Sequence, residues 1–304
     1  MAARIERMIE SQIGLNLAVS LARAAPPQMG YAIAAQAARL ISTRRNARLV
    51  RAVRSNQWVV GGETLSRAAL DQAVQGVFRN AARSVYEVYH YAQNPEAAGQ
   101  FYSFSPSFKA LMDRPEFAER GLIIAGLHIS NFDLALQWIC SMHWIKPLVL
   151  TIPNPQNGRQ LEFEIRKKTG MNLIPATMSG IRQSINHLKQ GGTVATGIDR
   201  PVDECQHQPL FFGRPAYLPI HHIHLALAAH TPVILVACRL EKDGLYHLIA
   251  SPPIEMDPYQ SHADELVCNA EKVLSTAEIF IRQTPQQWVI TRPVWPETIH
   301  LAPG

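Results

Sequence analysis

The stretch 121-GLIIAGLHISNFDLALQW-138 decides how the rest of the sequence is interpreted. Seven nearly continuous apolar residues lead directly to His128, and a helical pattern begins three residues later, near Asn131. A short apolar run of this kind is typical of a strand that is buried on both faces. The sequence therefore predicts a strand over 121–127 that is followed at once by a helix, which is the repeating unit of an α/β fold.

The alternation of strands and helices continues along the chain. Further strands are predicted at 147–152, 172–176, 193–198, 232–240 and 244–253, and helices at 157–170, 178–192, 217–231 and 261–283. Short links between such elements favour a parallel sheet with helices on both faces. Only residues 241–243 separate the last two strands, which indicates a hairpin. We therefore predict an α/β fold with a mixed, mostly parallel central sheet flanked by helices.

Residues 1–95 have a different character, because alanine and arginine, which both favour helices, dominate them. Breaks are expected at Pro26-Pro27 and Gly61-Gly62. We therefore divide the chain into an N-terminal helical segment, 1–95, which is basic and membrane-associating, and an α/β core, 96–304. The two parts are expected to form one compact unit.

Positive charge is concentrated in the N-terminal segment. Residues 1–95 hold twelve arginines, no lysine and five acidic residues, which gives +7, whereas the whole chain has a formal net charge of +5. On a helix over 44–54, Arg44, Arg48 and Arg51 share one face. Such a segment is attracted to an anionic membrane surface or to nucleic acid, although a solvated helix face has the same pattern. No zinc-finger or RNA-recognition signature supports nucleic acid, so the predicted partner is an anionic membrane surface.

Composition argues against several classes of protein. The four cysteines lie far apart without a CxxC pair, which argues against a zinc site or a disulfide framework and fits a reducing compartment. No run of 18 uncharged apolar residues predicts a membrane-spanning helix, and no signal peptide is expected. His221 and His224 have the spacing of a metal-binding pair on a helix, but no neighbouring cysteine or carboxylate completes a ligand set. We therefore expect no metal.

His128 and Asp133 are the first candidate catalytic residues. In α/β sheets, sites gather at the carboxyl ends of strands, and His128 lies at such an end. On one continuous helix the two side chains would point about 140° apart, whereas across a strand-to-helix junction they are able to meet. A histidine with a carboxylate partner acts as a general base. The alternative is a structural histidine bonded to a backbone carbonyl, with Asp133 in the first helical turn as a dipole partner.

A second polar cluster, within 197–219, follows the strand at 193–198. Asp199 and Arg200 also lie at the carboxyl end of a strand, and an arginine there is able to bind a phosphate or to pair with Asp199.

Taken together, these motifs resemble those of the bacterial lipid A late-acyltransferase family, within the lysophospholipid acyltransferase superfamily, and especially its phosphatidylinositol mannoside acyltransferase branch. The resemblance covers most of the chain. It rests on motifs that occur in the family's order: His128 and Asp133, Arg166 before Gly170-Met171, Gly191-Gly192, Asp199-Arg200, Phe211-Phe212-Gly213, and the closing segment 285-PQQWVITRPVW-295.

The resemblance implies an O-acyltransferase in which His128 is the base and Asp133 orients it. Arg166 and Arg200 are then expected to contact phosphate, Asp199 to shape the substrate site, and Asn131 to belong to the substrate-binding group. The expected donor is an acyl thioester, either acyl-CoA or acyl-ACP, in which acyl carrier protein carries the chain. The expected acceptor is a hydroxyl of a glycolipid or lysophospholipid. The implied location is peripheral, on the cytoplasmic face of the inner membrane, with no cofactor.

Three positions depart from the branch pattern. Pro201 replaces an acid after Asp-Arg, Gln208 replaces an acid before Phe-Phe-Gly, and the stretch 150–155 lacks an arginine. These changes bear on recognition of the acceptor's head group and leave the histidine–aspartate pair untouched. Two other functions remain open from the sequence: an acyl-thioester hydrolase, and a non-catalytic lipid-binding protein.

Overall fold

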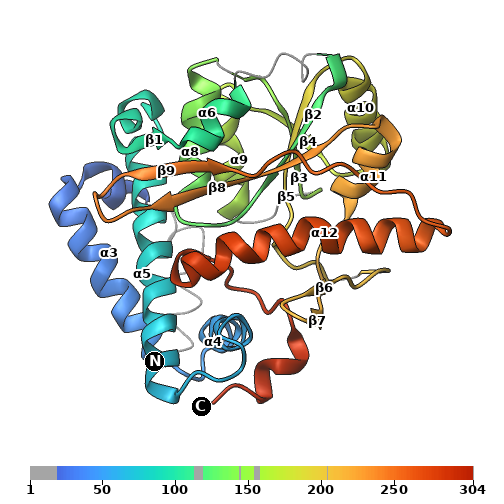
Figure 1. Cartoon of the computed structure of the whole chain (residues 1–304). Helices are drawn as coiled ribbons and strands as arrows, with labels where there is room; N and C mark the ends of the chain where they lie inside the picture. The colour runs from blue at the N-terminus through green and yellow to red at the C-terminus, as the bar shows by residue number, and fades with distance from the viewer. Residues whose placement is uncertain (1–18, 113–118, 144, 154–157, 204, 304) are drawn as a thin grey trace.

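The computed structural model describes residues 19–112, 119–143, 145–153, 158–203 and 205–303 (Figure 1). A seven-stranded sheet with the strand order β1-β9-β8-β2-β5-β3-β4 forms its centre. The strands of this sheet are β1 (Tyr102–Phe104), β2 (Leu122–Gly126), β3 (Leu148–Thr151), β4 (Asn172–Pro175), β5 (Thr193–Gly197), β8 (Val233–Leu240) and β9 (Tyr246–Ala250).

Most neighbouring strands of the sheet run parallel, as the sequence predicts. Strand β2 lies at the centre and pairs in parallel with both β5 and β8. The predicted hairpin is the antiparallel pair β8–β9, and β1 adds a parallel partner at the far side of β9. The fold class, an α/β protein with a mixed and mostly parallel sheet, is therefore confirmed.

Helices cover both faces of the sheet. On one face, α6 (Pro106–Met112) and α8 (Phe132–Ser141) pack against β8 and β9 through an aromatic and aliphatic cluster. The larger core lies on the other face, where α10 (Met178–Lys189), α11 (His221–Ala229) and α12 (His262–Gln283) cover the sheet. In Figure 1, α12 is the long red helix that runs across the view below β8 and β9. The layered arrangement leaves the carboxyl ends of β2, β3 and β5 at one edge, where their following loops meet.

Three helices of the N-terminal segment, α3 (Pro27–Ser42), α4 (Arg48–Val60) and α5 (Arg67–Tyr91), pack beside this core (Figure 1). Helix α4 is joined to the C-terminal part of the chain by buried polar contacts. The side chain of Asn56 donates to the carbonyl of Arg292 at 2.8 Å and accepts from the backbone N–H of Val294 at 3.0 Å. The N-terminal helices therefore lie against the core, and the boundary near residue 95 stays a prediction.

Two segments differ in detail from the sequence prediction. Helix α11 begins at His221 instead of residue 217, because 217-YLP-219 has no regular secondary structure and a proline lacks the N–H that a helix interior needs. The apolar turn at Phe211-Phe212-Gly213 closes a small hairpin of β6 (Leu210–Phe211) and β7 (Arg214–Pro215). Both central residues of that turn have positive φ, 52° at Phe212 and 74° at Gly213, as hairpin turns require.

The described residues also include helical residues 19–24, helix α9 (Gly158–Lys168) and the 3₁₀ turns η1 (Pro95–Phe101), η2 (Pro285–Gln287) and η3 (Pro296–His300). Among the described residues, none of the helices is both long enough and apolar enough to cross a membrane.

Candidate active site

His128 lies where β2 ends, and its partner is Asp199, at the end of the neighbouring strand β5. The imidazole Nδ1 lies 2.6 Å from Asp199 Oδ1, and the backbone N–H of His128 donates to Asp199 Oδ2 at 2.8 Å. The indole N–H of Trp288 donates to the same Oδ2 at 2.9 Å. Adjacent parallel strands place these two polar residues at one edge of the sheet, although they are 71 positions apart in the sequence.

The environment of Asp199 keeps its carboxyl group ionised. Burial of this completely buried side chain raises its pKa, but the charge of His128 and the hydrogen bonds from His128 and Trp288 outweigh burial and hold the pKa below its ordinary value. An ionised carboxylate only accepts hydrogen bonds, so the proton between the two groups belongs to His128 Nδ1. In the neutral ring the other nitrogen, Nε2, carries no proton and is able to accept one.

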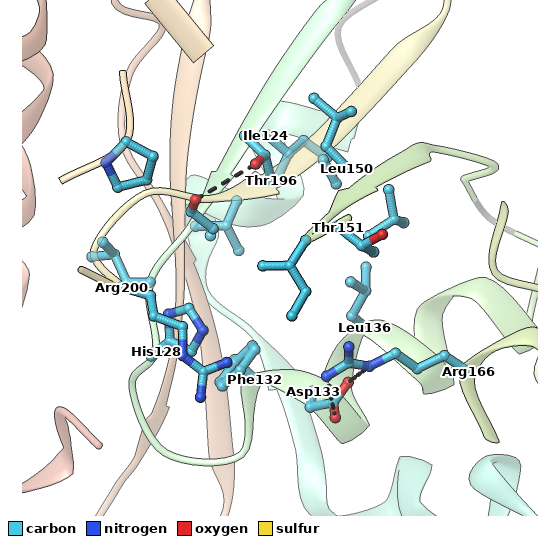
Figure 2. Close-up of a pocket in the computed structure, with 18 of the residues that line it drawn as sticks. Ile124, His128, Phe132, Asp133, Leu136, Leu150, Thr151, Arg166, Thr196 and Arg200 are labelled. Atoms are coloured by element: carbon cyan, nitrogen blue, oxygen red, sulfur yellow. Dashed lines mark hydrogen bonds and ion pairs between the residues drawn. The ribbon is translucent and has the colours of Figure 1, made fainter. Parts of the chain in front are cut away.

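The prediction that Asp133 orients the imidazole of His128 is wrong, because the carboxylate of Asp133 binds a different side chain. Arg166, near the end of α9, donates to Asp133 from Nε and from Nη2, at 2.9 Å in each case. The reversal occurs at Ser130, whose φ of 49° turns the chain sharply before α8 starts. Asp133 therefore enters the first turn of α8 facing α9, while the imidazole faces β5. Figure 2 shows Asp133 paired with the guanidinium of Arg166, and His128 at a separate place on the wall.

The loop that carries His128 is fixed by a segment from the C-terminal part of the chain. The carbonyl of His128 accepts from the backbone N–H of Val289 at 2.9 Å. Ser130 is held twice by Gln287, through a backbone bond of 2.7 Å and a side-chain bond of 2.6 Å. Gly197 lies against the ring of His128, since a Cβ atom at this position would be only 2.9 Å from His128 Cε1. The position of the imidazole is thus determined from several directions.

A cavity of about 620 Å³ opens beside His128. Its volume lies within the range of about 300–1,000 Å³ that is usual for small-molecule sites. Most of its wall is apolar and comes from the sheet and from α8, with contributions from the neighbouring loops: Phe108, Ile124, Leu127, Phe132, Ala135, Leu136, Ile139, Ile145, Val149, Leu150, Met171, Val236 and Leu248. Figure 2 shows Ile124, Leu136 and Leu150 on this wall. The cavity suits a long apolar group whose reactive end lies at the imidazole.

Polar side chains line the remaining part of the cavity. Arg166 and Arg200, both predicted from the sequence, lie on the wall, and so does Arg292, which also contacts Asp203. Strong desolvation lowers the pKa of Arg166, but the carboxylate of Asp133 more than offsets it, so the pKa is raised and the guanidinium stays charged. A His221 side chain on the wall is bonded through Nε2 to the hydroxyl of Thr196 at 2.5 Å.

Two predicted substrate-binding residues do not line the cavity. Asp199 is completely buried behind the imidazole, and Asn131 is 1% exposed and donates its side-chain amide to Glu87. Neither side chain is therefore placed to contact a bound substrate: Asp199 bonds to His128, and Asn131 bonds to Glu87 outside the cavity wall.

Within the described residues, neither a metal site nor a nucleophilic cysteine is supported. No group of three histidine, cysteine or carboxylate side chains there is arranged to hold a metal ion. The thiol of Cys238 lines the cavity, but burial raises its pKa well above the ordinary value, so it stays protonated and is a poor nucleophile.

The comparison with protein families identifies the family of the chain. The family model of the bacterial lipid A biosynthesis acyltransferases matches residues 10–296. The chain belongs to this family. It is therefore an enzyme, an acyltransferase of lipid biosynthesis. No match was found among the curated proteins.

Sequence reasoning on this acyltransferase missed Trp288 and Gln287 as parts of the site. Both lie in 285-PQQWVITRPVW-295, which the sequence flags only by resemblance. No local pattern shows that a tryptophan so far from the histidine donates to the carboxylate behind it. The available signal was a conspicuous tryptophan followed by a short apolar run, which predicts burial but does not identify a partner.

Proposed function

We propose that this acyltransferase moves a fatty acyl chain from an acyl thioester to a hydroxyl of a glycolipid or lysophospholipid, with His128 as the general base. The observation that carries the proposal is the combination of an apolar cavity with an oriented imidazole on its wall. Acyl-CoA and acyl carrier protein remain the two expected donors, because both present the same thioester. A phosphatidylinositol mannoside is one acceptor of the proposed glycolipid class.

The proposed reaction needs one base and no covalent enzyme intermediate. The acceptor hydroxyl attacks the thioester carbonyl carbon while His128 Nε2 takes its proton. The tetrahedral intermediate then collapses, the carbon–sulfur bond breaks, and the imidazolium returns the proton to the leaving thiolate. Asp199 stabilises the imidazolium between these two steps and fixes its tautomer.

In this proposal the apolar wall along α8 binds the fatty chain. Helix α8 rises about 1.5 Å per residue, so the eight residues from Phe132 to Ile139 span about 10 Å of that wall. Arg166, Arg200 and Arg292 supply positive charge on the same cavity, where a phosphate of either substrate is able to bind.

The test of the proposal is mass spectrometry of a bacterial lipid extract after incubation with the enzyme and a mixture of acyl-CoA and acyl carrier protein donors. We expect a new acylated lipid, and we expect His128→Ala to reduce its formation at least 1,000-fold while the protein remains folded. His262→Ala is a suitable control, because that side chain is 70% exposed on α12. Normal acyl transfer by His128→Ala would exclude the proposed base. Release of free fatty acid without any acylated lipid would identify a hydrolase instead.

We further propose that the N-terminal helices attach the enzyme peripherally to an anionic membrane surface, on the cytoplasmic face of the inner membrane. Helix α3 exposes apolar side chains, with Met29 at 56%, Ile33 at 49% and Leu40 at 63%. Arg48 and Arg51 are exposed at the start of α4. Apolar side chains together with arginines are the pattern of an interfacial helix.

Arg54 does not belong to this surface, although it completes the arginine run in the sequence. It is 5% exposed and donates from Nη1 and Nη2 to Asp71, at 2.7 and 2.8 Å. The structure thus divides the run into exposed arginines that are available to lipid head groups and a buried one that holds α4 against α5.

Co-sedimentation with phosphatidylglycerol vesicles tests the attachment. Replacing Arg48 and Arg51 by glutamine is expected to weaken binding about 30-fold at low salt, since each arginine contributes roughly 1 kcal/mol. The variant Arg182→Gln/Lys189→Gln removes the same charge from exposed positions on α10 and is expected to change binding little. Equal binding by all three proteins would contradict the role of the arginines.

A further inference from the structure

The carboxylate of Glu87, on α5, is buried away from the cavity and accepts four hydrogen bonds. Its side chain is 2% exposed. Oε1 accepts from the hydroxyl of Tyr31 at 3.0 Å and from Nε of Arg83 at 2.8 Å. Oε2 accepts from the hydroxyl of Tyr246 at 2.7 Å and from the side-chain amide of Asn131 at 2.6 Å. The four donors come from α3, α5, β9 and the start of α8, so one side chain connects four elements.

The charge of Glu87 has a counter-charge within the cluster. The guanidinium of Arg83, one helical turn away, pairs with Oε1 and lies over the rings of Tyr31 and Tyr246, at 5.1 and 5.3 Å from their centroids. Burial first and the carboxylate second raise the pKa of both tyrosines, so their hydroxyls stay protonated and continue to donate. A buried carboxylate is tolerated only with partners of this kind.

Asn131 is the residue through which this cluster reaches the site. It is the N-cap of α8, a position where an asparagine usually accepts a hydrogen bond from its own helix, but here its side chain makes no such bond. Its amide donates to Glu87 instead. Asn131 lies between Ser130, which the C-terminal segment holds, and Phe132, whose ring centroid lies 4.5 Å from that of His128.

We propose that Glu87 is a positioning residue for the acyl-transfer reaction, acting through Asn131 on the segment from His128 to Asp133. The inference rests on the proposed function, because it concerns the geometry of that same imidazole. Gln287 holds one side of the segment and Glu87 the other, so loss of either leaves the ring of Phe132 and the first turn of α8 free to shift against His128. The carboxylate itself touches neither substrate nor the reacting atoms.

Steady-state kinetics of Glu87→Gln test the inference. The substitution keeps the shape of the side chain but removes its charge and replaces one acceptor oxygen by a donor. Because Tyr31 and Arg83 share one oxygen, and Tyr246 and Asn131 share the other, the amide nitrogen faces two of the four donors whichever way it is turned. We expect kcat for acyl transfer to fall about tenfold, with KM for the acyl donor within twofold of the wild-type value. Tyr31→Phe removes one hydrogen bond from the same carboxylate without involving α8, and its kcat is expected to stay within twofold of wild type.

The double variant Glu87→Gln/Asn131→Ala distinguishes positioning from a general loss of stability. If Glu87 acts through Asn131, Asn131→Ala alone lowers kcat about tenfold and the double variant is no slower than the worse single variant. The inference would be overturned if the double variant lowered kcat by the product of the two single effects. A wild-type kcat in Glu87→Gln would also overturn it. Hydrogen exchange gives a second readout, because Glu87→Gln is expected to raise exchange in 128–136 more than in β5.

The wild-type enzyme separates failure of this inference from failure of the proposed function. If the wild-type enzyme forms no acylated lipid, the proposed function is refuted, and hydrogen exchange still decides whether Glu87 positions the segment. Active wild-type enzyme together with unchanged kcat and exchange in Glu87→Gln refutes the inference alone. If Glu87→Gln does not fold, Asn131→Ala breaks the same contact from its other side and is expected to show the same changes.

Discussion

Two hydrogen-bonded pairs, each with one carboxylate, lie at the carboxyl edge of the sheet, and they differ in burial and in what they connect. The pair of His128 and Asp199 joins neighbouring strands, and its carboxylate is completely buried behind the imidazole. The pair of Asp133 and Arg166 joins α8 to α9, and both of its side chains are partly exposed, at 15% and 19%. In the proposed reaction the first pair moves a proton, whereas the second is a charged pair on the wall of the cavity.

The comparison shows that nearness in sequence is a poor guide to the partner of the candidate catalytic histidine. Asp133 is five positions from His128, yet it reaches across to α9, while Asp199 is 71 positions away and lies within hydrogen-bond distance. Parallel pairing of β2 with β5 makes the distant contact, since Gly126 and Gly197 lie side by side in register. A motif of the form His-x-x-x-x-Asp therefore identifies two site residues without identifying a pair.

Asp199→Asn provides the largest expected effect and the strongest test of this difference. An asparagine has the same shape but is able to donate to Nδ1, which favours the wrong imidazole tautomer. We expect kcat for acyl transfer to fall about 1,000- to 10,000-fold, as for the buried aspartate of serine protease triads. Near-wild-type far-ultraviolet circular dichroism is the control for folding. A loss below tenfold would show that the imidazole does not depend on this carboxylate.

Asp133→Asn is expected to have a smaller effect, because it removes charge from the wall and leaves the imidazole contact intact. The guanidinium of Arg166 loses a charged, two-point partner but keeps one acceptor oxygen. We expect kcat/KM to fall about 10- to 30-fold, equivalent to about 1.4–2 kcal/mol of binding. If Asp133→Asn reduces activity as strongly as Asp199→Asn, the distinction between the two pairs is wrong, and Asp133 acts on His128 once substrate is bound.

His221 is a contrast to His128, because the hydrogen-bond partner of its ring is the hydroxyl of Thr196 instead of a carboxylate. Burial, followed by the nearby His224, lowers the pKa of His221 to about 4. The unfolded chain has a histidine pKa of about 6.5, so between these values it binds more protons than the folded chain. The free energy of unfolding therefore falls as the pH drops from 6.5 towards 4.

Urea unfolding at a series of pH values measures this effect. Because the side chain is only partly buried, we expect a loss of about 1–2 kcal/mol from His221 between pH 6.5 and 4. His221→Asn removes the titrating ring, so its stability is expected to depend less steeply on pH over this range. An unchanged slope would assign the acid sensitivity to other groups, such as the buried His222.

Much of the fold was predictable from the sequence, because strand burial and helix ends have local signals. The apolar run before His128 and the glycines after α9 and α10 gave element positions that the structure confirms. The sequence predicts the start of α11 too early. The apolar periodicity continues through Pro219, whereas the helical backbone begins only after it. Strand β1 has only three residues and gains its stability from pairing with β9, so no local pattern shows it.

The site was predicted less completely, because its contacts join parts of the chain that are far apart. The sequence identifies His128, Arg166 and Arg200 as wall residues, and the structure places all three on one cavity. It does not show which carboxylate orients the imidazole or that Asn131 faces Glu87, since both depend on how the chain reverses at Ser130. Left-handed backbone at a serine has no reliable sequence signal.

Residues 285–289 contact the loop that carries His128, so this loop reaches its final arrangement only late in synthesis on the ribosome. The indole that bonds Asp199 is made 89 residues after that aspartate, and the backbone contacts to His128 and Ser130 come from the same late segment. A growing chain that already contains both members of the pair still lacks the residues that align them. In the reaction proposed above, such an unfinished chain is expected to cleave no acyl thioester until translation has passed this segment.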